Sequence, residues 1–140
     1  MKSEENCSSS EDTTLGLQLE IEHRGPVVIV RCKGRIVYRN EAAELSDKIG
    51  KLLESGQAPV LDFAAVEAID SAGLGELVLL HMRGQSTGRR IKLASPNQRV
   101  RHLLEITNLV SIVDLYPTLD AAIDASSRQL ARRYKIAASL

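Results

Sequence analysis

Strand-like and helix-like patterns of apolar residues alternate along the chain from residue 17 onward, and this alternation restricts the fold more than any other feature. Short apolar or alternating segments, which indicate strands, occur at 17–22, 27–30, 59–63, 91–94 and 112–115. Apolar residues at three- and four-residue spacing, which indicate helices, occur at 40–55, 72–86, 96–107 and 118–133. This order predicts an α/β fold with a mostly parallel sheet of four to five strands, about four helices and right-handed crossovers.

The first two strand segments are expected to form a hairpin. Leu17, Leu19 and Ile21 alternate with polar residues, as in a strand buried on one face. A turn at Arg24-Gly25-Pro26 leads into the continuous apolar run 27–30, which suits a strand covered on both faces. Because the connection is short, we predict an antiparallel pair with the first strand at the edge of the sheet.

Residues with known preferences for helix ends mark the expected helix boundaries. We expect Asn40 to cap the first helix, Pro96 to lie in the first turn of the third, and Thr118 to cap the last. Gly56 and Gly88 follow helical segments and are expected to end them.

The chain is expected to form one domain with two short tails. Its 140 residues suffice for a single core. Residues 1–14 are rich in serine and acidic residues and are expected to be disordered. The periodic segment then defines a domain at 15–133, and 134–140 is expected to be a C-terminal tail.

Composition excludes several kinds of partner. Lys plus Arg and Asp plus Glu both number 18, so the formal net charge is zero and no basic face for nucleic acid or anionic lipid is expected. No apolar run approaches the ~18 residues of a membrane span, and the N-terminal segment lacks the apolar core of a signal peptide. Cys7 and Cys32, the two cysteines, have neither disulfide-framework nor zinc-site spacing, which favours a reduced, cytoplasmic protein.

One strand-to-helix junction has an unusual sequence, Ala68-Ile69-Asp70-Ser71-Ala72-Gly73-Leu74-Gly75-Glu76-Leu77. Ser71 is placed as the N-cap of the helix. Gly73 and Gly75 then fall in its first turns, although each glycine costs a helix about 0.8–1 kcal/mol relative to alanine. Two explanations remain open: the glycines allow another backbone or a phosphate to approach, or Gly73 only allows the helix to pack closely on the sheet.

The segment D-S-A-G-L-G at residues 70–75, after a short strand, resembles the signature of the STAS domain family of bacterial anti-sigma factor antagonists. Cys32-Lys33-Gly34-Arg35-Ile36 resembles the end of the family's second strand, and Leu61-Asp62-Phe63 its third strand. The resemblance spans about residues 17–130. It implies the STAS fold and a binding protein that needs no cofactor and is not an enzyme.

The resemblance also implies a phosphorylation switch. In such antagonists the serine of the D-S pair is phosphorylated by the anti-sigma factor, a serine/threonine kinase of the histidine-kinase-like ATPase type. The unphosphorylated antagonist binds that kinase and releases a sigma factor for transcription in a stress response, and a serine phosphatase resets the cycle. Ser71 would carry the phosphate, and the contact surface would comprise Asp70, Ser71, Ala72, Gly73, Gly75 and Glu76, with Asp62 and Arg35.

The electrostatics of a helix N-terminus are compatible with a phosphorylation switch at Ser71. A phosphoserine adds about −1.5 to −2 charges, which the N-terminus of a helix tolerates. Asp70 is adjacent and Asp62 is expected nearby, so the position would become strongly anionic and repel a partner fitted to a neutral hydroxyl. A change of ~3–4 kcal/mol would weaken binding by about two to three decades.

Other motifs favour no catalytic function. His23, His81 and His102 lack metal-ligand spacing to a carboxylate or thiol, and Ile69 replaces the first glycine of the hydrolase motif G-x-S-x-G. The segment 84–90 lacks the Gly-Lys-Ser/Thr core of a phosphate loop. Four cations cluster near the C-terminus: Arg128, Arg132, Arg133 and Lys135. They are expected either to stabilise the C-terminal end of a helix through its dipole or to bind an acidic partner.

Three alternatives to the antagonist remain open on sequence grounds. Domains that resemble STAS domains also occur as subunits of lipid-transport ABC complexes and as scaffolds of stress-signalling assemblies. The third alternative, a small enzyme on a flavodoxin-like fold, would need a cluster of acid, base and nucleophile that the sequence does not show.

Overall fold

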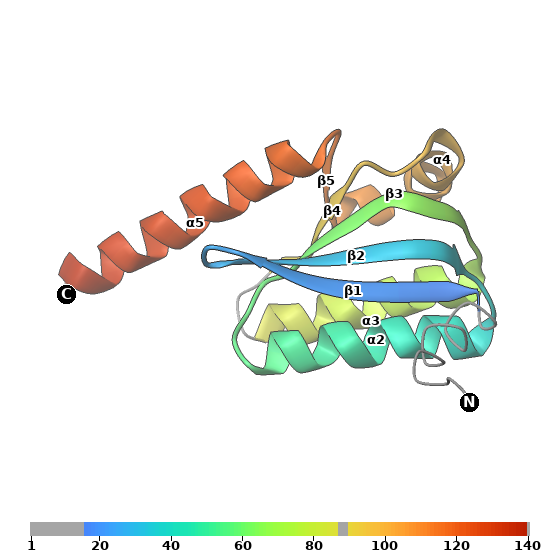
Figure 1. Ribbon diagram of the computed structural model, residues 1–140, viewed down its shortest axis with the longest axis horizontal. Coiled ribbons are helices and arrows are strands. Elements are labelled where there is room, and N and C mark those ends of the chain that lie inside the picture. Colours follow the sequence, from blue (N-terminus) through green and yellow to red (C-terminus); the bar gives the residue numbers. More distant parts are fainter. Residues whose placement is uncertain (1–15, 87–89, 140) are drawn as a thin grey trace, which may run out of the picture.

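The computed structural model describes residues 16–86 and 90–139, and it contains a five-stranded sheet with strand order β1-β2-β3-β4-β5 (Figure 1). The strands are β1 (Leu17–Arg24), β2 (Val27–Ile36), β3 (Val60–Ile69), β4 (Lys92–Ala94) and β5 (Asp114–Tyr116). β1 pairs with β2 antiparallel, and every later pair is parallel. The α/β fold and the hairpin expected from the sequence are therefore confirmed. The expected tail 1–14, Cys7 and Gly88 lie outside the described residues.

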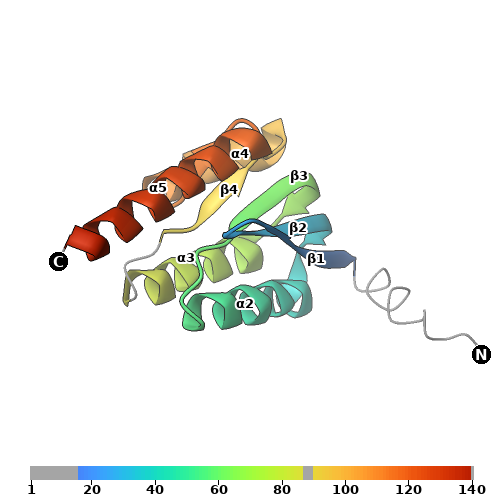
Figure 2. The same cartoon turned by 60° about the vertical axis from the view of Figure 1, so that its left-hand side comes forward.

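Four α-helices are described: α2 (Tyr38–Glu54), α3 (Ser71–Ser86), α4 (Gln98–Ile106) and α5 (Leu119–Ser139). A short 3-10 helix, Leu109–Ser111, follows α4. Because the parallel strands are in sequential order, right-handed crossovers place α2, α3 and α4 on the same face of the sheet. Figure 2 shows α5 on the opposite side of the sheet from α2 and α3.

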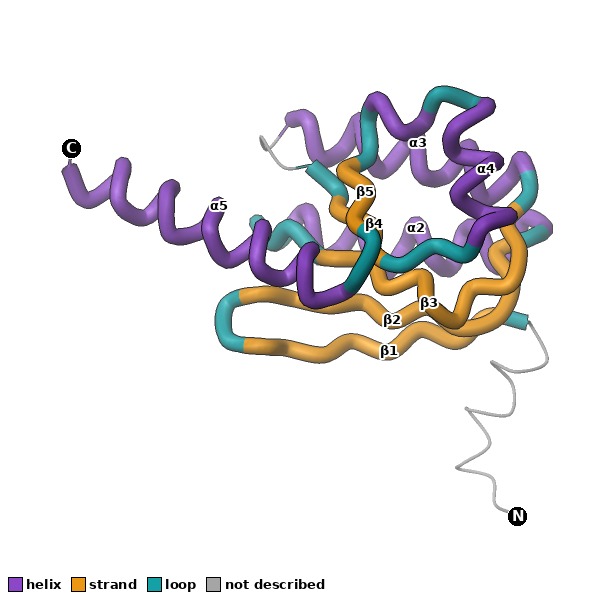
Figure 3. The backbone as a smooth tube through the Cα atoms, turned by 90° about the horizontal axis from the view of Figure 1, so that it is seen from above, coloured by secondary structure: helices purple, strands orange, loops and turns teal. Residues whose placement is uncertain are grey.

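Two apolar clusters hold these layers together. The larger one lies between the sheet and α2, α3 and α4, and includes Phe63, Leu45, Leu77 and Leu104. The smaller one lies under α5 and joins Val27, Ile29, Val60, Ala94 and Ala122. α5 therefore covers part of its face of the sheet, and its C-terminal half extends past the β1–β2 turn (Figure 3).

The helix boundaries differ from the expected ones where a cap was misplaced. α2 begins at Tyr38 after Val37, so Asn40 lies in its first turn and does not cap it. Asn97, not Pro96, defines the start of α4, since its Oδ1 accepts a hydrogen bond from the backbone N–H of Val100 at 2.8 Å. A short polar side chain caps α4 but none caps α2, and neighbouring candidates in the sequence cannot be distinguished without the backbone path.

Two other boundary predictions hold, at Gly56 and Thr118, and the end of α5 differs. Gly56 has φ +87°, the left-handed conformation expected after a helix. Thr118 Oγ1 accepts a hydrogen bond from the backbone N–H of Ala121 at 3.1 Å and so caps α5. α5 runs to Ser139 rather than to about residue 133, so the segment expected as a tail is helical through Ser139. The side chains of Arg133 and Lys135 lie outside the described ones.

β3, like β2, is longer than predicted, with ten residues in place of five. The predicted strand stops at Phe63, because the alanines that follow, Ala64 and Ala65, have a low strand propensity. Backbone pairing with β2 continues to Ile69 through two register shifts. Because of this extension, Asp62 lies near the start of β3, whereas the β3–α3 junction follows its end.

The Asn97 side chain connects α4 to β3, and this gives a stability prediction. Besides capping α4, its Nδ2 donates to the carbonyl of Val66 at 3.0 Å. We expect Asn97→Ala to lower the free energy of unfolding by about 1–2 kcal/mol. Asn97→Asp should recover part of the loss, because it keeps the capping oxygen but has no amide to donate. Urea denaturation measures both; a Gln98→Ala control should change little, and equal losses for the alanine and aspartate variants would contradict the capping role.

Candidate functional site at the β3–α3 junction

Asp70, between β3 and α3, caps α3. Its Oδ1 accepts hydrogen bonds from the backbone N–H groups of Ala72 and Gly73 at 3.0 and 3.1 Å. α3 begins at Ser71, which is therefore the first residue inside the helix. The prediction that Ser71 is the cap is wrong, because the carboxylate one residue earlier reaches the same N–H groups.

Ser71 is consequently free of a capping role. The residue is exposed, and no hydrogen bond joins its hydroxyl to another residue in the described part of the chain. The positive end of the helix dipole favours negative charge at such a position. The Ser71 hydroxyl can therefore be modified without the loss of a hydrogen bond that stabilises the fold.

The two glycines of the junction have different environments. At Gly73 a Cβ atom would come within 2.6 Å of Ile69 Cγ1 and 2.7 Å of the carbonyl oxygen of Ile36. Close packing against the ends of β2 and β3 therefore requires glycine there. At Gly75 a Cβ atom would meet nothing within 4 Å. Of the two explanations left open by the sequence, close packing applies to Gly73, and Gly75 is unobstructed on the exposed side of α3.

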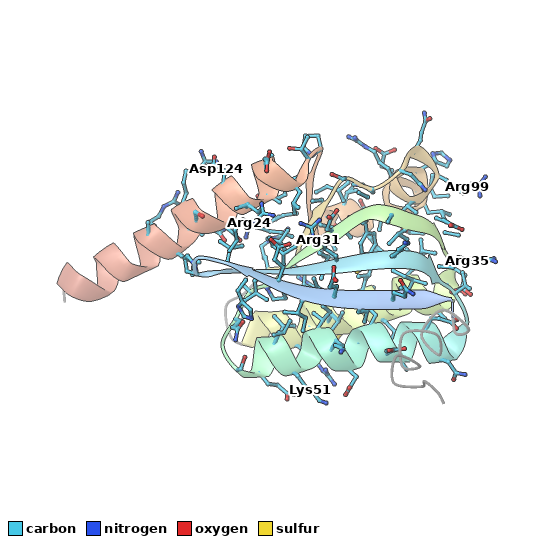
Figure 4. All side chains as sticks on the ribbon, viewed as in Figure 1. Arg24, Arg31, Arg35, Lys51, Arg99 and Asp124 are labelled. Atoms are coloured by element: carbon cyan, nitrogen blue, oxygen red, sulfur yellow. The ribbon has the colours of Figure 1, made fainter. Side chains whose placement is uncertain are left out.

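The remaining residues proposed for the contact surface are near the junction, with one exception. Arg35 is exposed at the end of β2 and pairs in register with Ala68 (Figure 4). The carbonyl of Ile36, the next residue, accepts a hydrogen bond from the backbone N–H of Asp70 at 3.2 Å. Ala72 and Glu76 are half-buried in the first two turns of α3. The C-terminal edge of the sheet thus brings these residues together.

Asp62 is the exception. It precedes Asp70 by eight residues, which corresponds to roughly 25 Å along an extended strand. Its side chain is 9% exposed, and Oδ2 pairs with Arg31 Nη1 at 3.1 Å. The expectation that Asp62 lies beside Asp70 is wrong, because β3 continues well past Phe63. Asp62 therefore adds no direct charge to the surroundings of Ser71.

Arg31 is the centre of an ion-pair cluster that the sequence reasoning missed. It bridges Asp62 on β3 and Glu22 on β1, with the Arg31 Nη2–Glu22 Oε1 distance at 2.7 Å. Hydrogen bonds from Arg31 and Arg24 lower the pKa of the Glu22 carboxyl. A hollow of about 510 Å³, on the same face of the sheet as α5, is lined in part by Gln18, Glu20, Lys33 and Ala64. The only signal in the sequence was a charged residue that directly follows an apolar strand.

The described residues were also compared with the requirements of a metal site, a reactive cysteine and a membrane span. Within residues 16–86 and 90–139, no three His, Cys, Asp or Glu side chains lie close enough to hold a metal ion. His23, His81 and His102 lie on β1, α3 and α4. Cys32 is buried, and burial raises the pKa of its thiol, which disfavours the reactive thiolate. In the same described range, no helix is long and apolar enough to cross a membrane.

Comparison with known proteins gives a consistent set of relatives. A family model described as the STAS domain matches residues 18–122. A Thermotoga neapolitana protein that carries the name of an anti-sigma factor antagonist is 42% identical over 65 residues, which are 46% of this chain and 58% of that protein. The matched segment thus spans less than two thirds of this relative.

Solved structures agree with the family match. An anti-sigma factor antagonist from Mycobacterium paratuberculosis has a TM-score of 0.71 at 26% identity, over 79% of this chain and 94% of that one. The phosphorylated form of the Bacillus cell fate determinant SpoIIAA has a TM-score of 0.59 at 22% identity, over 78% and 97% of the two chains. The second likeness shows a shared fold.

The capping assignment predicts unequal effects of two neighbouring substitutions. Asp70→Ala should lower the free energy of unfolding by about 1 kcal/mol, because it removes the acceptor for two N–H groups. Ser71→Ala should change it by less than about 0.5 kcal/mol. Thermal and urea denaturation measure both. A larger loss for Ser71→Ala than for Asp70→Ala would contradict the assignment.

The Arg31 cluster predicts a pH-dependent loss of stability. Arg31→Met leaves the mostly buried Asp62 carboxylate without its cation, and we expect a loss of about 1–3 kcal/mol near pH 7. Because the pKa of Glu22 is lowered in the fold, its contribution is present above the unfolded pKa and is lost as the pH falls through the folded one. The difference in the free energy of unfolding between wild type and Arg31→Met should therefore become smaller at acid pH.

Arg24→Met is the matched control for the Arg31 variant, because Arg24 pairs with the same Glu22 but is more exposed. It should cost less than about 0.5 kcal/mol. Denaturation over a range of pH distinguishes the two variants. Equal losses of stability in the two variants would contradict the ion-pair cluster. So would a difference between wild type and Arg31→Met that becomes larger at acid pH.

Proposed function

The chain belongs to the STAS domain family, and we propose that it acts as an anti-sigma factor antagonist whose binding is switched off by phosphorylation of Ser71. The names of the similar Thermotoga and Mycobacterium proteins support this function. In this proposal the chain acts by binding rather than by catalysis. It works in the cytoplasm, where sigma factors direct transcription.

The observation that carries the proposal is the division of roles between Asp70 and Ser71. Asp70 supplies the cap, while Ser71 offers an exposed hydroxyl without a hydrogen bond to a described residue. A kinase can reach such a hydroxyl, and the fold does not depend on it. The helix N-terminus then stabilises the added phosphate, so the domain stays folded and only its surface changes.

The expected change at the surface is local. Phosphorylation adds about −1.5 to −2 charges at Ser71. Asp62 is paired with Arg31 elsewhere on the sheet, and the Asp70 carboxylate accepts hydrogen bonds from the start of α3. The phosphate itself therefore supplies the repulsion and the desolvation cost that a partner meets. A loss of ~3–4 kcal/mol would weaken binding by about two to three decades.

The proposed partner is an anti-sigma factor that is also a serine/threonine kinase, and a serine phosphatase removes the phosphate. When unphosphorylated, the antagonist occupies the anti-sigma factor and so releases a sigma factor. When phosphorylated, it dissociates. The exposed Ser71 at the sheet edge suits both enzymes, because each must enclose the hydroxyl or phosphate in its own active site.

Incubation with purified anti-sigma factor kinases of the source organism and ATP tests the proposal. Peptide mass spectrometry should find one phosphate, on Ser71, and none on Ser71→Ala. By calorimetry, Ser71→Ala should bind the kinase like the wild type, whereas Ser71→Asp should bind about 100-fold more weakly. A phosphate on another residue, or equal binding of the alanine and aspartate variants, would disprove the switch.

A further inference from the structure

β1 has a long outer edge that no described strand occupies. It is the first strand in the order β1-β2-β3-β4-β5, and it pairs with β2 alone, over eight residues and without a register shift (Figure 3). β5, at the opposite edge of the sheet, has three residues. Proteins commonly protect a long edge strand with a proline or a bulge, and β1 has neither. Its outer edge can therefore accept another strand.

One hydrogen bond shows which backbone groups of β1 face outward. The backbone N–H of Arg35 donates to the carbonyl of Gly16 at 2.7 Å. In an antiparallel pair, residues bonded to the neighbouring strand alternate with residues whose N–H and C=O point the other way. The even-numbered residues of β1 therefore bond β2, and the odd-numbered ones direct both backbone groups away from the sheet. These outward residues are Leu17, Leu19, Ile21 and His23.

An incompletely covered apolar surface runs along the same edge. Leu17 and Leu19 belong to or pack against the core between the sheet and α2, whereas Ile21, on the same side of β1, is 40% exposed. Beside Ile21 is a hollow of about 300 Å³, and Leu52 and Lys51 of α2 line its other side. A strand added at this edge would cover Ile21 and would also bond the outward backbone groups.

The charges of β1 select the strand and the register that fit. In an antiparallel pair of two β1 strands, a two-fold axis at residue 20, 21 or 22 places two glutamates, Glu20 or Glu22, directly opposite one another. Like charges in that position destabilise a strand pair. An axis at Leu19 avoids this, because Leu17 then lies opposite Ile21 and Glu20 opposite a neutral residue. It also places outward-directed residues opposite outward-directed residues, as hydrogen bonding requires.

We propose that two copies of this chain associate through β1, antiparallel and with the two-fold axis at Leu19, so that the two sheets become continuous. Leu17 exchanges backbone hydrogen bonds with Ile21 of the second copy, and Leu19 with Leu19 of the second copy. The apolar side chains of these residues form one row on the helix side, which covers Ile21. Because the paired segment is short, we expect a reversible dimer with a dissociation constant of roughly 100 µM. No kinase takes part, so this dimer does not rest on the proposed function.

Proline substitutions test the backbone pairing. Ile21→Pro removes an N–H that points away from β2, so the β1–β2 pair is kept, and the dimer should weaken at least about tenfold. His23→Pro is the matched control, since its N–H also points outward but lies beyond the paired residues 17–21; it should change the dissociation constant less than about twofold. Sedimentation equilibrium from about 10 µM to about 1 mM measures the association, and circular dichroism verifies folding.

Charge substitutions at Gln18 test the register in variants that keep the apolar residues of β1. Within the chain, residue 18 lies opposite the exposed Lys33 of β2, so Gln18→Glu is compatible with the fold. Across the proposed axis it lies opposite Glu20 of the second copy, and repulsion should weaken the dimer about fivefold. Gln18→Lys should instead strengthen the dimer about fivefold, although it places two cations side by side within one chain. Shifts of the same sign in both variants would disprove the register.

Amide hydrogen exchange identifies the edge directly. Exchange at Leu19 and Ile21 should become slower as the protein concentration rises, whereas exchange at His23 should not change. A chain that stays monomeric at about 1 mM would overturn the proposal. A dimer that keeps its affinity in a folded Ile21→Pro variant would overturn it as well. Neither result bears on the switch at Ser71, because these measurements contain no kinase.

Discussion

The contact between the first turn of α3 and the end of β2 is the constraint on which the site depends. Gly73 lies so close to the Ile36 carbonyl that no other residue fits, and the same carbonyl accepts the backbone N–H of Asp70. Together they determine where α3 starts relative to the sheet. Asp70 is thereby directed at the helix N-terminus and Ser71 at solvent, so packing of the core decides which side chain remains available to a partner.

The site contains residues that stabilise the fold and, beside them, exposed residues that the fold does not require. Gly73 and Asp70 are fully engaged within the fold, whereas the Ser71 and Arg35 side chains make no polar interaction with a described residue and Gly75 has open space beside it. Such a division allows charge to be added at Ser71 without unfolding the domain, since no stabilising bond is lost. A regulator that must bind, release and bind again needs this separation between the groups that stabilise it and the groups that change.

Sequence patterns predicted the element order well and the local geometry less well. Alternating and helical periodicities reflect burial, which the sheet and its helices satisfy over many residues, so the α/β order and the hairpin are as expected. Caps depend on single side chains, so Asp70 rather than Ser71 caps α3, and Asn97 caps an α4 that begins after Pro96 instead of including it. Asp62 was misplaced because Ala64 and Ala65, which have a low strand propensity, gave no indication that β3 continues to Ile69.

The sequence alone therefore determined the fold class, the family resemblance and the position of the D-S-A-G-L-G segment at a strand-to-helix junction, because periodicity and a local motif need only neighbouring residues. Only the tertiary structure decided the roles within that segment. Gly73 packs against Ile36, and Asp62 pairs with Arg31, although each pair is more than 30 positions apart in the sequence. Those distances are set by strand length and register, which the sequence pattern does not specify.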